Sequence, residues 1–177
     1  MKKILAILLT LCLVFAFAAC GQTEEEKLEA AKQAFNEFNT AVNSETVIAT
    51  TARVITDSNG EKMLVTDIQN NGDTAVSEVV VCFAVWNAEG APITVKTKRN
   101  PENTIYEFQM DVTGVTVEAG ATWSENKGLY LAEGAEEIGF AKAVVVSCKK
   151  GEETYENPNY SAWKETYLEK TLEEYMR

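Results

Sequence analysis

The reactive side chains of this chain are thiols, carboxylates, amines and phenols, because the sequence contains no histidine. The lack of histidine excludes Ser-His-Asp and Cys-His nucleophiles, imidazole metal ligands and an imidazole proton switch near neutral pH. Only Cys82 and Cys148 lie beyond the N-terminal region, and the sequence has no CxxC pair. Zinc sites built from cysteine and histidine are therefore excluded, and we expect no catalytic residue, no metal and no cofactor.

Another cysteine, Cys20, ends a segment with the layout of a secretory signal. A basic start at residues 1–3 precedes an apolar run at 4–19, and small residues stand directly before Cys20. Bacterial lipoprotein processing acylates a cysteine in this setting and cuts the chain before it. We expect residues 1–19 to be a lipoprotein signal peptide and Cys20 to carry acyl chains such as palmitate.

Two other interpretations of this segment stay open. An uncleaved membrane anchor is disfavoured, because the run 4–19 is shorter than the roughly 20 residues that a helix needs to cross a bilayer. Ordinary cleavage after Ala19 would release a soluble protein with a free N-terminal cysteine. Lipidation at Cys20 instead predicts a stable anchor, since each buried methylene adds about 0.8 kcal/mol. We expect the protein at the extracytoplasmic face of a cell membrane.

The chain is acidic, with a formal net charge of −11. Removal of Lys2 and Lys3 with the signal makes the mature chain more acidic still. This balance argues against charge-driven binding of nucleic acid or anionic lipid, and leaves cations, neutral glycans, peptides and basic proteins as ligands. Solubility alone would also explain the charge.

The pair Cys82 and Cys148 lies in the two most apolar segments, 79–86 and 143–148. In an exported protein, two cysteines on neighbouring strands can form a disulfide. An immunoglobulin-type bridge has a tryptophan packed against it, but Trp86 here follows Cys82 on the same expected strand, so the usual spacing is absent. A disulfide between Cys82 and Cys148 and a pair of buried thiols both stay open.

Carboxylates are abundant, but spacing singles out no pair of them. A glycan hydrolase needs two carboxyl groups roughly 5–10 Å apart across a cleft, and a sequence does not give that separation. The segment 57–61, Asp-Ser-Asn-Gly-Glu, is faintly similar to a calcium loop. It lacks the spacing and the terminal glutamate of an EF-hand, so we interpret it as a hairpin turn.

Aromatic side chains are the remaining candidates for a binding site. Trp123, Tyr155, Tyr160 and Trp163 combine an apolar ring with a polar group, as residues of sugar and peptide sites do. Packing in the core would use such large side chains equally well. We predict these four as ligand-binding aromatics, with the segment 155–163 as the first place to look.

The elements that would position these residues begin with a helix at 23–43. Thr23 and Glu26 form a capping box, and Leu28, Phe35 and Phe38 belong to one apolar stripe. This stripe predicts a seam for a partner, a surface that packs on the rest of the chain, or a helix that stands off the chain as a spacer.

The middle of the chain is rich in Val, Ile and Thr, which predicts strands. Segments 79–86 and 143–148 are apolar at successive positions, as central strands covered on both faces are. From Pro158 onward a C-terminal helix is predicted, and strands without a long helix between them predict a β-sandwich. Seven strands are expected, at 46–56, 61–70, 76–88, 91–98, 104–117, 121–131 and 138–150.

The chain resembles a family of uncharacterised bacterial lipoprotein domains, known only as a domain of unknown function. The residues that carry the resemblance are 70–72, 83–87, 89–93, 118–120 with Trp123, 127–128, and 157–160 with Trp163. The resemblance covers about residues 47–170. It implies an immunoglobulin- or fibronectin-like sandwich with a C-terminal helical tail, and it implies no reaction, ligand or catalytic residue.

These observations predict a mainly β protein, an immunoglobulin-like β-sandwich flanked by an N-terminal and a C-terminal helix. The expected domains are a signal peptide at 1–19, the anchor and N-terminal helix at 20–45, and the sandwich with its C-terminal helix at 46–177. We expect a lipid-anchored, extracytoplasmic, non-catalytic binding module for an unknown protein, peptide or glycan, with no nucleic-acid partner. The alternatives are an envelope spacer without a ligand and a carboxylate-based glycan hydrolase.

Overall fold

The computed structural model describes residues 23–124, 127–133 and 137–177. The expected signal peptide and Cys20 lie outside the described residues. The chain divides into two compact units, one containing the N-terminal helix and one, from residue 45, containing the strands and the C-terminal helix. No helix in the described part of the chain is long and apolar enough to span a membrane.

The N-terminal helix α2 spans Glu24–Asn43, within one residue of the expected range. The predicted capping box is present: the Thr23 hydroxyl accepts from the Glu26 amide at 3.2 Å, and the Glu26 carboxylate accepts from the Thr23 amide at 2.8 Å. Three glutamates in the first turn face the positive end of the helix dipole. Within the apolar stripe, Phe38 is buried and Leu28 is exposed.

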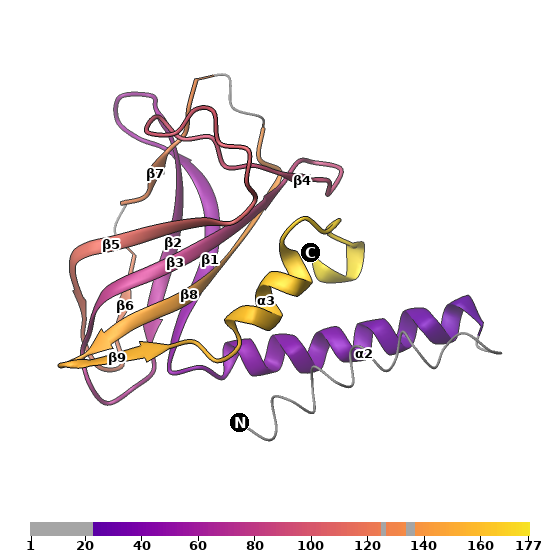
Figure 1. Cartoon of the computed structure of the whole chain (residues 1–177), viewed down its shortest axis with the longest axis horizontal. Helices are drawn as coiled ribbons and strands as arrows, with labels where there is room; N and C mark the ends of the chain where they lie inside the picture. Colours follow the sequence, from indigo (N-terminus) through magenta and orange to yellow (C-terminus); the bar gives the residue numbers. More distant parts are fainter. Residues whose placement is uncertain (1–22, 125–126, 134–136) are drawn as a thin grey trace. The chain divides into compact units, whose positions relative to one another are not determined.

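The second unit consists of two antiparallel sheets, whose strands overlap in the view of Figure 1. In the first sheet β2 pairs with β1, β6 and β7, and in the second sheet β3 pairs with β4, β5 and β8, which in turn pairs with β9. The strands of the first sheet are β1 (Val47–Thr56), β2 (Lys62–Asn70), β6 (Thr122–Trp123) and β7 (Leu129–Tyr130). Those of the second are β3 (Val76–Trp86), β4 (Pro92–Ile93), β5 (Phe108–Val117), β8 (Phe140–Lys150) and β9 (Glu153–Glu156).

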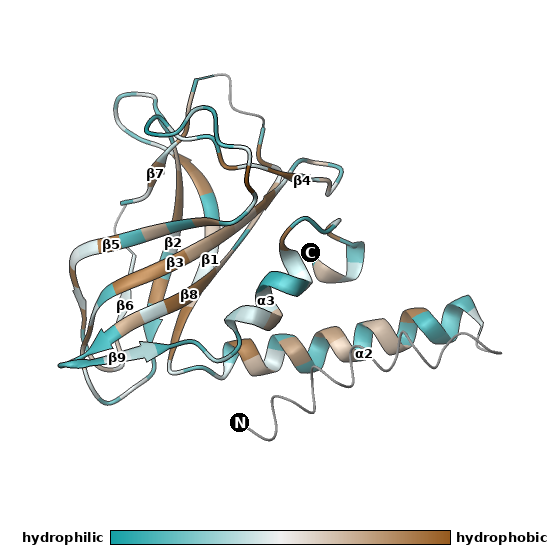
Figure 2. Cartoon of the chain, in the orientation of Figure 1, coloured by the Kyte–Doolittle hydropathy of each residue, from teal (hydrophilic) through white to brown (hydrophobic). Residues whose placement is uncertain are grey.

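The hydrophobic core lies between the two sheets. Leu64 and Ile68 of the first sheet and Val81 of the second are completely buried and belong to one cluster. Figure 2 shows β3 as a largely hydrophobic strand, in agreement with the prediction that the segment 79–86 is central. The predicted fold class is confirmed: the protein is mainly β, with two sheets and one helix at each end of the strand region.

Three strand predictions were inaccurate, and one strand was missed. The expected strand 91–98 is reduced to β4, because residues 96–98 turn to the other sheet. They contact it through isolated hydrogen bonds, such as the one that the Lys98 amide donates to the Tyr130 carbonyl at 2.9 Å. The expected strand 104–117 begins only at Phe108, since the Asn103 amide holds the preceding loop to the Val95 carbonyl. The expected strand 121–131 is two short strands, β6 and β7, and the polar strand β9 was not predicted.

The C-terminal helix α3 (Tyr160–Tyr167) is shorter than expected and is followed by a turn at 168–170 and an irregular segment. This stretch, residues 168–175, is called the C-terminal strap below; its end overlaps a 3₁₀ turn at Glu174–Met176. The Leu172 amide donates to the Gly90 carbonyl at 2.8 Å, and the Trp86 indole donates to the Lys170 carbonyl at 2.7 Å. The strap is therefore fastened to β3 and to the β3–β4 turn.

Candidate functional site

Cys82 and Cys148 are both buried free thiols, so of the two alternatives the structure has the unbridged one. Cys148 belongs to the core between the sheets, whereas Cys82 alternates with the core residues Val81 and Phe83 and therefore points to the opposite face of the second sheet. Burial raises the pKa of the Cys82 thiol to about 11. A protonated, buried thiol is a poor nucleophile, which agrees with a structural role.

The four predicted aromatics do not gather around a common hollow. Trp163 and Trp123 are buried, with exposed fractions of 2% and 8%. Trp163 packs against Tyr167, with their ring centres 5.3 Å apart. The indole nitrogen of Trp123 is buried and has no hydrogen-bond partner within the described residues. Both tryptophans thus serve packing, the other use that the sequence allowed.

Tyr160 lies in a hydrogen-bonded cluster on the face of the second sheet that carries Cys82. Its hydroxyl donates to the Glu107 carboxylate at 2.6 Å and accepts from the Gln109 amide at 3.0 Å. Lys164, one turn along α3, is 3.4 Å from the same carboxylate. The Tyr160 hydrogen bond, more than the lysine, holds the pKa of Glu107 below its ordinary value. The cluster fastens α3 to the sheet.

We expect Tyr160→Phe to lower the free energy of unfolding at neutral pH by about 0.5–1 kcal/mol, a value reduced for the partial exposure of Glu107. Because the native pKa of Glu107 is depressed, its contribution is present above the unfolded pKa and is lost as the pH falls through the native pKa. The difference from wild type should therefore shrink in acid. Urea titrations at several pH values measure it, with Tyr106→Phe as the control; a difference independent of pH would contradict the assignment.

Tyr155 occupies a second polar position, at the other end of the same sheet. Its hydroxyl hydrogen-bonds to Glu45, and burial with this contact raises the pKa of the phenol. The Asn159 side chain donates to the same carboxylate, and the Lys150 ammonium lies 4.1 Å from the centre of the Tyr155 ring. These contacts tie β9 and the start of α3 to the entry of β1, so Tyr155 is also a structural residue.

The segment 57–61 forms the turn between β1 and β2. The Asp57 carboxylate accepts from the Asn59 amide at 2.8 Å and from the Glu61 amide at 2.9 Å, which closes the turn on itself. These backbone hydrogen bonds lower the pKa of Asp57. The hairpin interpretation is confirmed. Within the described residues, no group of three acidic or cysteine side chains is placed to hold a metal.

One concave feature lies between β5 of the second sheet and β7 of the first sheet. We call it the β5–β7 groove. Its volume is about 740 Å³, and it is lined by residues 97–100, 108–113 and 127–130. Phe108, Met110 and Leu129 supply apolar surface, and Tyr130, with 42% of its surface exposed, stands at the rim. This volume falls within the range of small-ligand sites, and the lining combines apolar and polar groups.

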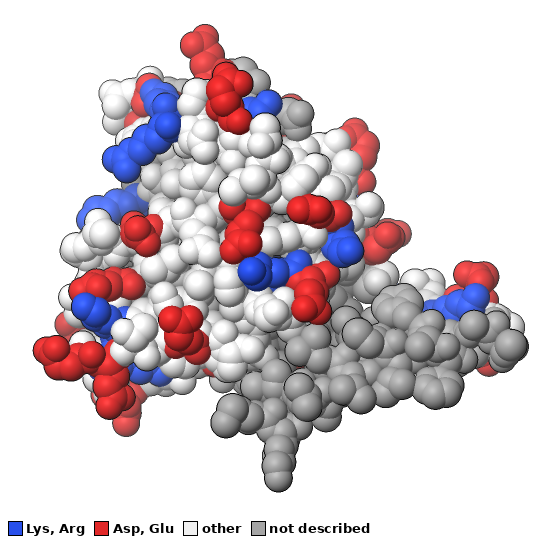
Figure 3. Space-filling view, in the orientation of Figure 1, with Lys and Arg blue, Asp and Glu red and all other residues white. Residues whose placement is uncertain are grey.

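The lining of the groove is locally basic in an acidic chain. It contains Lys98, Arg99 and Lys127, against the single carboxylate of Asp111. Lys98 forms an ion pair with Glu61 and lies 5.6 Å from the centre of the Tyr130 ring. Figure 3 shows a group of basic side chains at the upper left of the visible face, the end that carries β7 in Figure 1.

A second hollow of about 630 Å³ adjoins this groove through Lys98. Three glutamates line it, Glu61, Glu133 and Glu137. Glu133 and Glu137 are exposed, and Glu61 is paired with Lys98. A general acid needs a buried setting that keeps its proton, and neither of the exposed glutamates has one.

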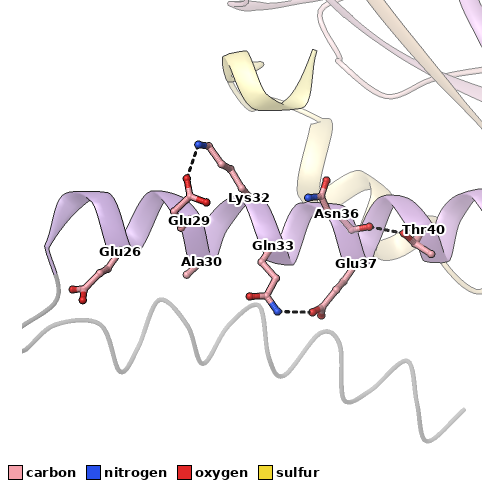
Figure 4. A pocket seen from close by; sticks show the side chains of 8 residues that line it. All are labelled: Glu26, Glu29, Ala30, Lys32, Gln33, Asn36, Glu37 and Thr40. Carbon is pink, nitrogen blue, oxygen red and sulfur yellow. Dashed lines mark hydrogen bonds and ion pairs between the residues drawn. The ribbon is translucent and has the colours of Figure 1, made fainter.

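Helix α2 carries a third concave surface, but it belongs to one side of a single helix. As Figure 4 shows, its polar side chains bond to their own neighbours: Lys32 to Glu29 at 2.7 Å, and Gln33 to Glu37 at 3.2 Å. Such contacts are those of a solvated helix face. The residues drawn are Glu26, Glu29, Ala30, Lys32, Gln33, Asn36, Glu37 and Thr40.

Sequence reasoning did not find the β5–β7 groove. Net charge averages over the chain and conceals three cations that come together from residues 98–99 and 127. The sequence did predict a strand at 104–117, but nothing in the sequence placed this strand at the edge of a sheet. A local signal was present in the basic run Lys96, Lys98 and Arg99, which stands out from an acidic background.

Comparisons with known proteins agree with the fold and leave the activity open. No functionally curated protein matches this chain. A solved hypothetical protein from Peptoclostridium difficile 630 has a similar structure, with a TM-score of 0.60 and 9% identity over 76% of this chain and 99% of that chain, a likeness that shows the fold alone. Residues 63–170, which include all the residues that line the groove, match a family described as a "Family of unknown function (DUF5780)". Because this match spans more than half of the sequence, the chain belongs to the DUF5780 family.

Proposed function

We propose that this protein is a lipid-anchored, extracytoplasmic binding module without catalytic activity, and that its ligand occupies the β5–β7 groove. The observation that carries the binding role is the groove itself, which combines apolar surface, an exposed tyrosine and three basic side chains. Specific sites typically combine an apolar lining with a few polar groups that orient the ligand.

The location rests on the leader at residues 1–20. A basic start, an apolar run and small residues before Cys20 are the features that direct export and acylation of the cysteine. In the chain, helix α2 follows this anchor and precedes the first strand. The sandwich, which we take to be immunoglobulin-like, would then be presented at the cell surface.

A binding role suits the side chains better than catalysis does. The buried thiols have raised pKa values, and the chain has no histidine that could activate them. The glutamates of the second hollow are exposed or paired with lysine, which supports a binding surface over the alternative of a glycan hydrolase. The remaining alternative is an envelope spacer, which would need no ligand in the groove.

Replacing Cys20 tests the location. We expect Cys20→Ala to move the protein from the membrane fraction to the soluble or unprocessed fraction, because the thiol that receives the acyl chains is lost. Mass spectrometry of the wild type should show a mature chain that starts at Cys20 and carries at least two acyl groups. Cys12→Ala, a cysteine replacement within the leader, is the control and should leave processing unchanged; an unmodified full-length chain in the cytosol would contradict the proposal.

The binding role is tested on intact cells. We expect the anchored wild type to retain a ligand or partner that is depleted from the Cys20→Ala variant, because only the anchored protein stays in the compartment where the ligand is found. Recovery of nothing above that control would favour the spacer alternative.

A further inference from the structure

Of the described sheet edges, β5 is the one that combines length with an open flank. Strand β9 at the other end of the second sheet has four residues and carries Glu153 and Glu156, a short and charged edge that resists pairing. In the first sheet, β1 lies against β8. Strand β5 has ten residues and, among the strands of the described residues, pairs only with β3. Every second backbone N–H and C=O of β5 therefore points away from the sheet.

The β5–β7 groove runs along this free edge. Successive residues of a strand point to opposite faces of a sheet, so a hollow over one face would be lined by alternate residues. The groove is instead lined by six consecutive β5 residues, 108–113. It therefore follows the backbone edge. A bulge at Gly114, with φ of +71°, ends the regular edge after Thr113 and sets the length of the exposed backbone.

The opposite wall of the groove, residues 97–100 and 127–130, is held in place by backbone hydrogen bonds. The Lys98 amide donates to the Tyr130 carbonyl, and the Ala132 amide donates to the Lys96 carbonyl, both at 2.9 Å. These bonds position Lys98 and the adjacent Arg99 beside β7. The wall that carries Lys98 and Arg99 thus faces the edge of β5, whose outward-pointing N–H and C=O groups can hydrogen-bond to an added strand.

We propose that the β5–β7 groove binds an extended acidic peptide segment, which adds to the second sheet as a strand beside β5. The inference rests on the proposed binding role of the groove and names its ligand class. Backbone hydrogen bonds along residues 108–113 supply the register, and Arg99 and Lys127, beside the Lys98–Glu61 ion pair, supply charge complementarity.

The geometry also defines the pattern of the ligand. The exposed side chains of Gln109, Asp111 and Thr113 share one face of β5, while Phe108, Met110 and Val112 face inward. An acidic side chain beside Asp111 on the outer face would be repelled, since like charges directly opposite destabilise a strand pair. Acidic residues should therefore alternate with uncharged ones and point toward the basic wall.

A peptide explains the edge better than an anionic glycan does. Both would be attracted by three cations, but a glycan has no row of alternating amide donors and acceptors at strand spacing to match β5. Tighter binding of an acidic glycan than of the peptide would therefore count against the inference.

The test uses synthetic octapeptides and the mature protein in detergent micelles. We expect a peptide of alternating Glu and Thr to bind, and a Lys-Thr peptide to bind roughly tenfold more weakly or not at all. A peptide with the same composition in two blocks, Glu then Thr, keeps the charge and loses the alternation, so it should bind several-fold more weakly. N-methylation of alternate peptide residues should abolish binding in the register that uses those amides.

Protein variants separate the groove from general electrostatics. Arg99→Gln should weaken binding of the Glu-Thr peptide roughly two- to fivefold, whereas Lys149→Gln, an equal charge change at an ion pair with Glu78, should leave it unchanged. Hydrogen exchange should slow for β5 amides between residues 108 and 113 and stay constant in β9. These changes are expected in a protein that remains folded, because Arg99 is exposed.

The outcomes are distinct. Equal binding of the alternating and block peptides, or tighter binding of an oligogalacturonate probe than of either, would overturn strand addition. If no peptide binds but a groove-directed cross-linker captures a ligand on cells, the acidic-peptide inference fails and the proposed function stands. If neither occurs, the groove has no binding role and both proposals fail.

Discussion

Trp86→Ala is expected to lower the free energy of unfolding by about 3–5 kcal/mol, the usual range for removal of a large aromatic side chain from a core. Trp86 is 1% exposed at the end of β3. Its ring meets Tyr167 edge to face, with centres 5.8 Å apart, and its indole nitrogen donates to the Lys170 carbonyl at 2.7 Å. One side chain thus joins the second sheet, α3 and the C-terminal strap.

Chemical denaturation measures this loss, and Trp86→Phe is the matched control. Phenylalanine keeps most of the apolar ring but cannot donate to Lys170, so we expect it to cost about 1–2 kcal/mol. For a chain of this size, the alanine variant should melt roughly 10 °C lower. An alanine variant no less stable than the phenylalanine variant would show that the ring is not covered by the strap.

Gly90→Ala should have the second largest effect, about 2–4 kcal/mol, through two causes that add. Gly90 has φ of +89°, a conformation that costs an L residue about 1 kcal/mol or more. An added Cβ would also lie 2.8 Å from the Leu172 carbonyl oxygen, in the backbone of the strap. The strap would have to shift, and the bond from the Leu172 amide to the Gly90 carbonyl would break.

Gly60→Ala separates the two causes. Gly60 has a similar φ of +83°, and its added Cβ would meet nothing within 4 Å. We expect this control to lose only about 1 kcal/mol. Hydrogen exchange at the Leu172 amide should accelerate in Gly90→Ala and stay as in wild type in Gly60→Ala. Equal effects of the two substitutions on stability and exchange would show that the contact with the strap does not contribute to the effect of Gly90→Ala.

Much of the fold follows from local sequence signals. The capping box at Thr23 and Glu26 placed the start of α2, and the apolar segments 79–86 and 143–148 identified β3 and β8 as central strands. These signals succeed because each lies within one element. The interval 91–107 is different, since tertiary bonds decide its path: the Asn103 side chain binds the Val95 and Ile105 carbonyls, and residues 96–98 bond to the other sheet.

The candidate site was harder to predict, for a physical reason. The aromatics Tyr155, Tyr160 and Trp163 were singled out by type, but type does not distinguish a ring in a site from a ring under a helix. The structure uses them to attach β9 and α3. The groove instead depends on which strand lies at an edge and on cations from two separate loops. Such features appear only once the sheet order is known.

The central claim, that the groove receives a ligand at the cell surface, is tested most directly by site-specific cross-linking on intact cells. A photoreactive benzoyl-phenylalanine replaces Thr113, an exposed residue of β5 in the groove, or Thr154, an exposed residue of the other edge strand β9. We predict a discrete cross-linked product from the Thr113 position and none from the Thr154 position, with loss of the product in Cys20→Ala. Equal products from both positions, or none from Thr113, would contradict the account.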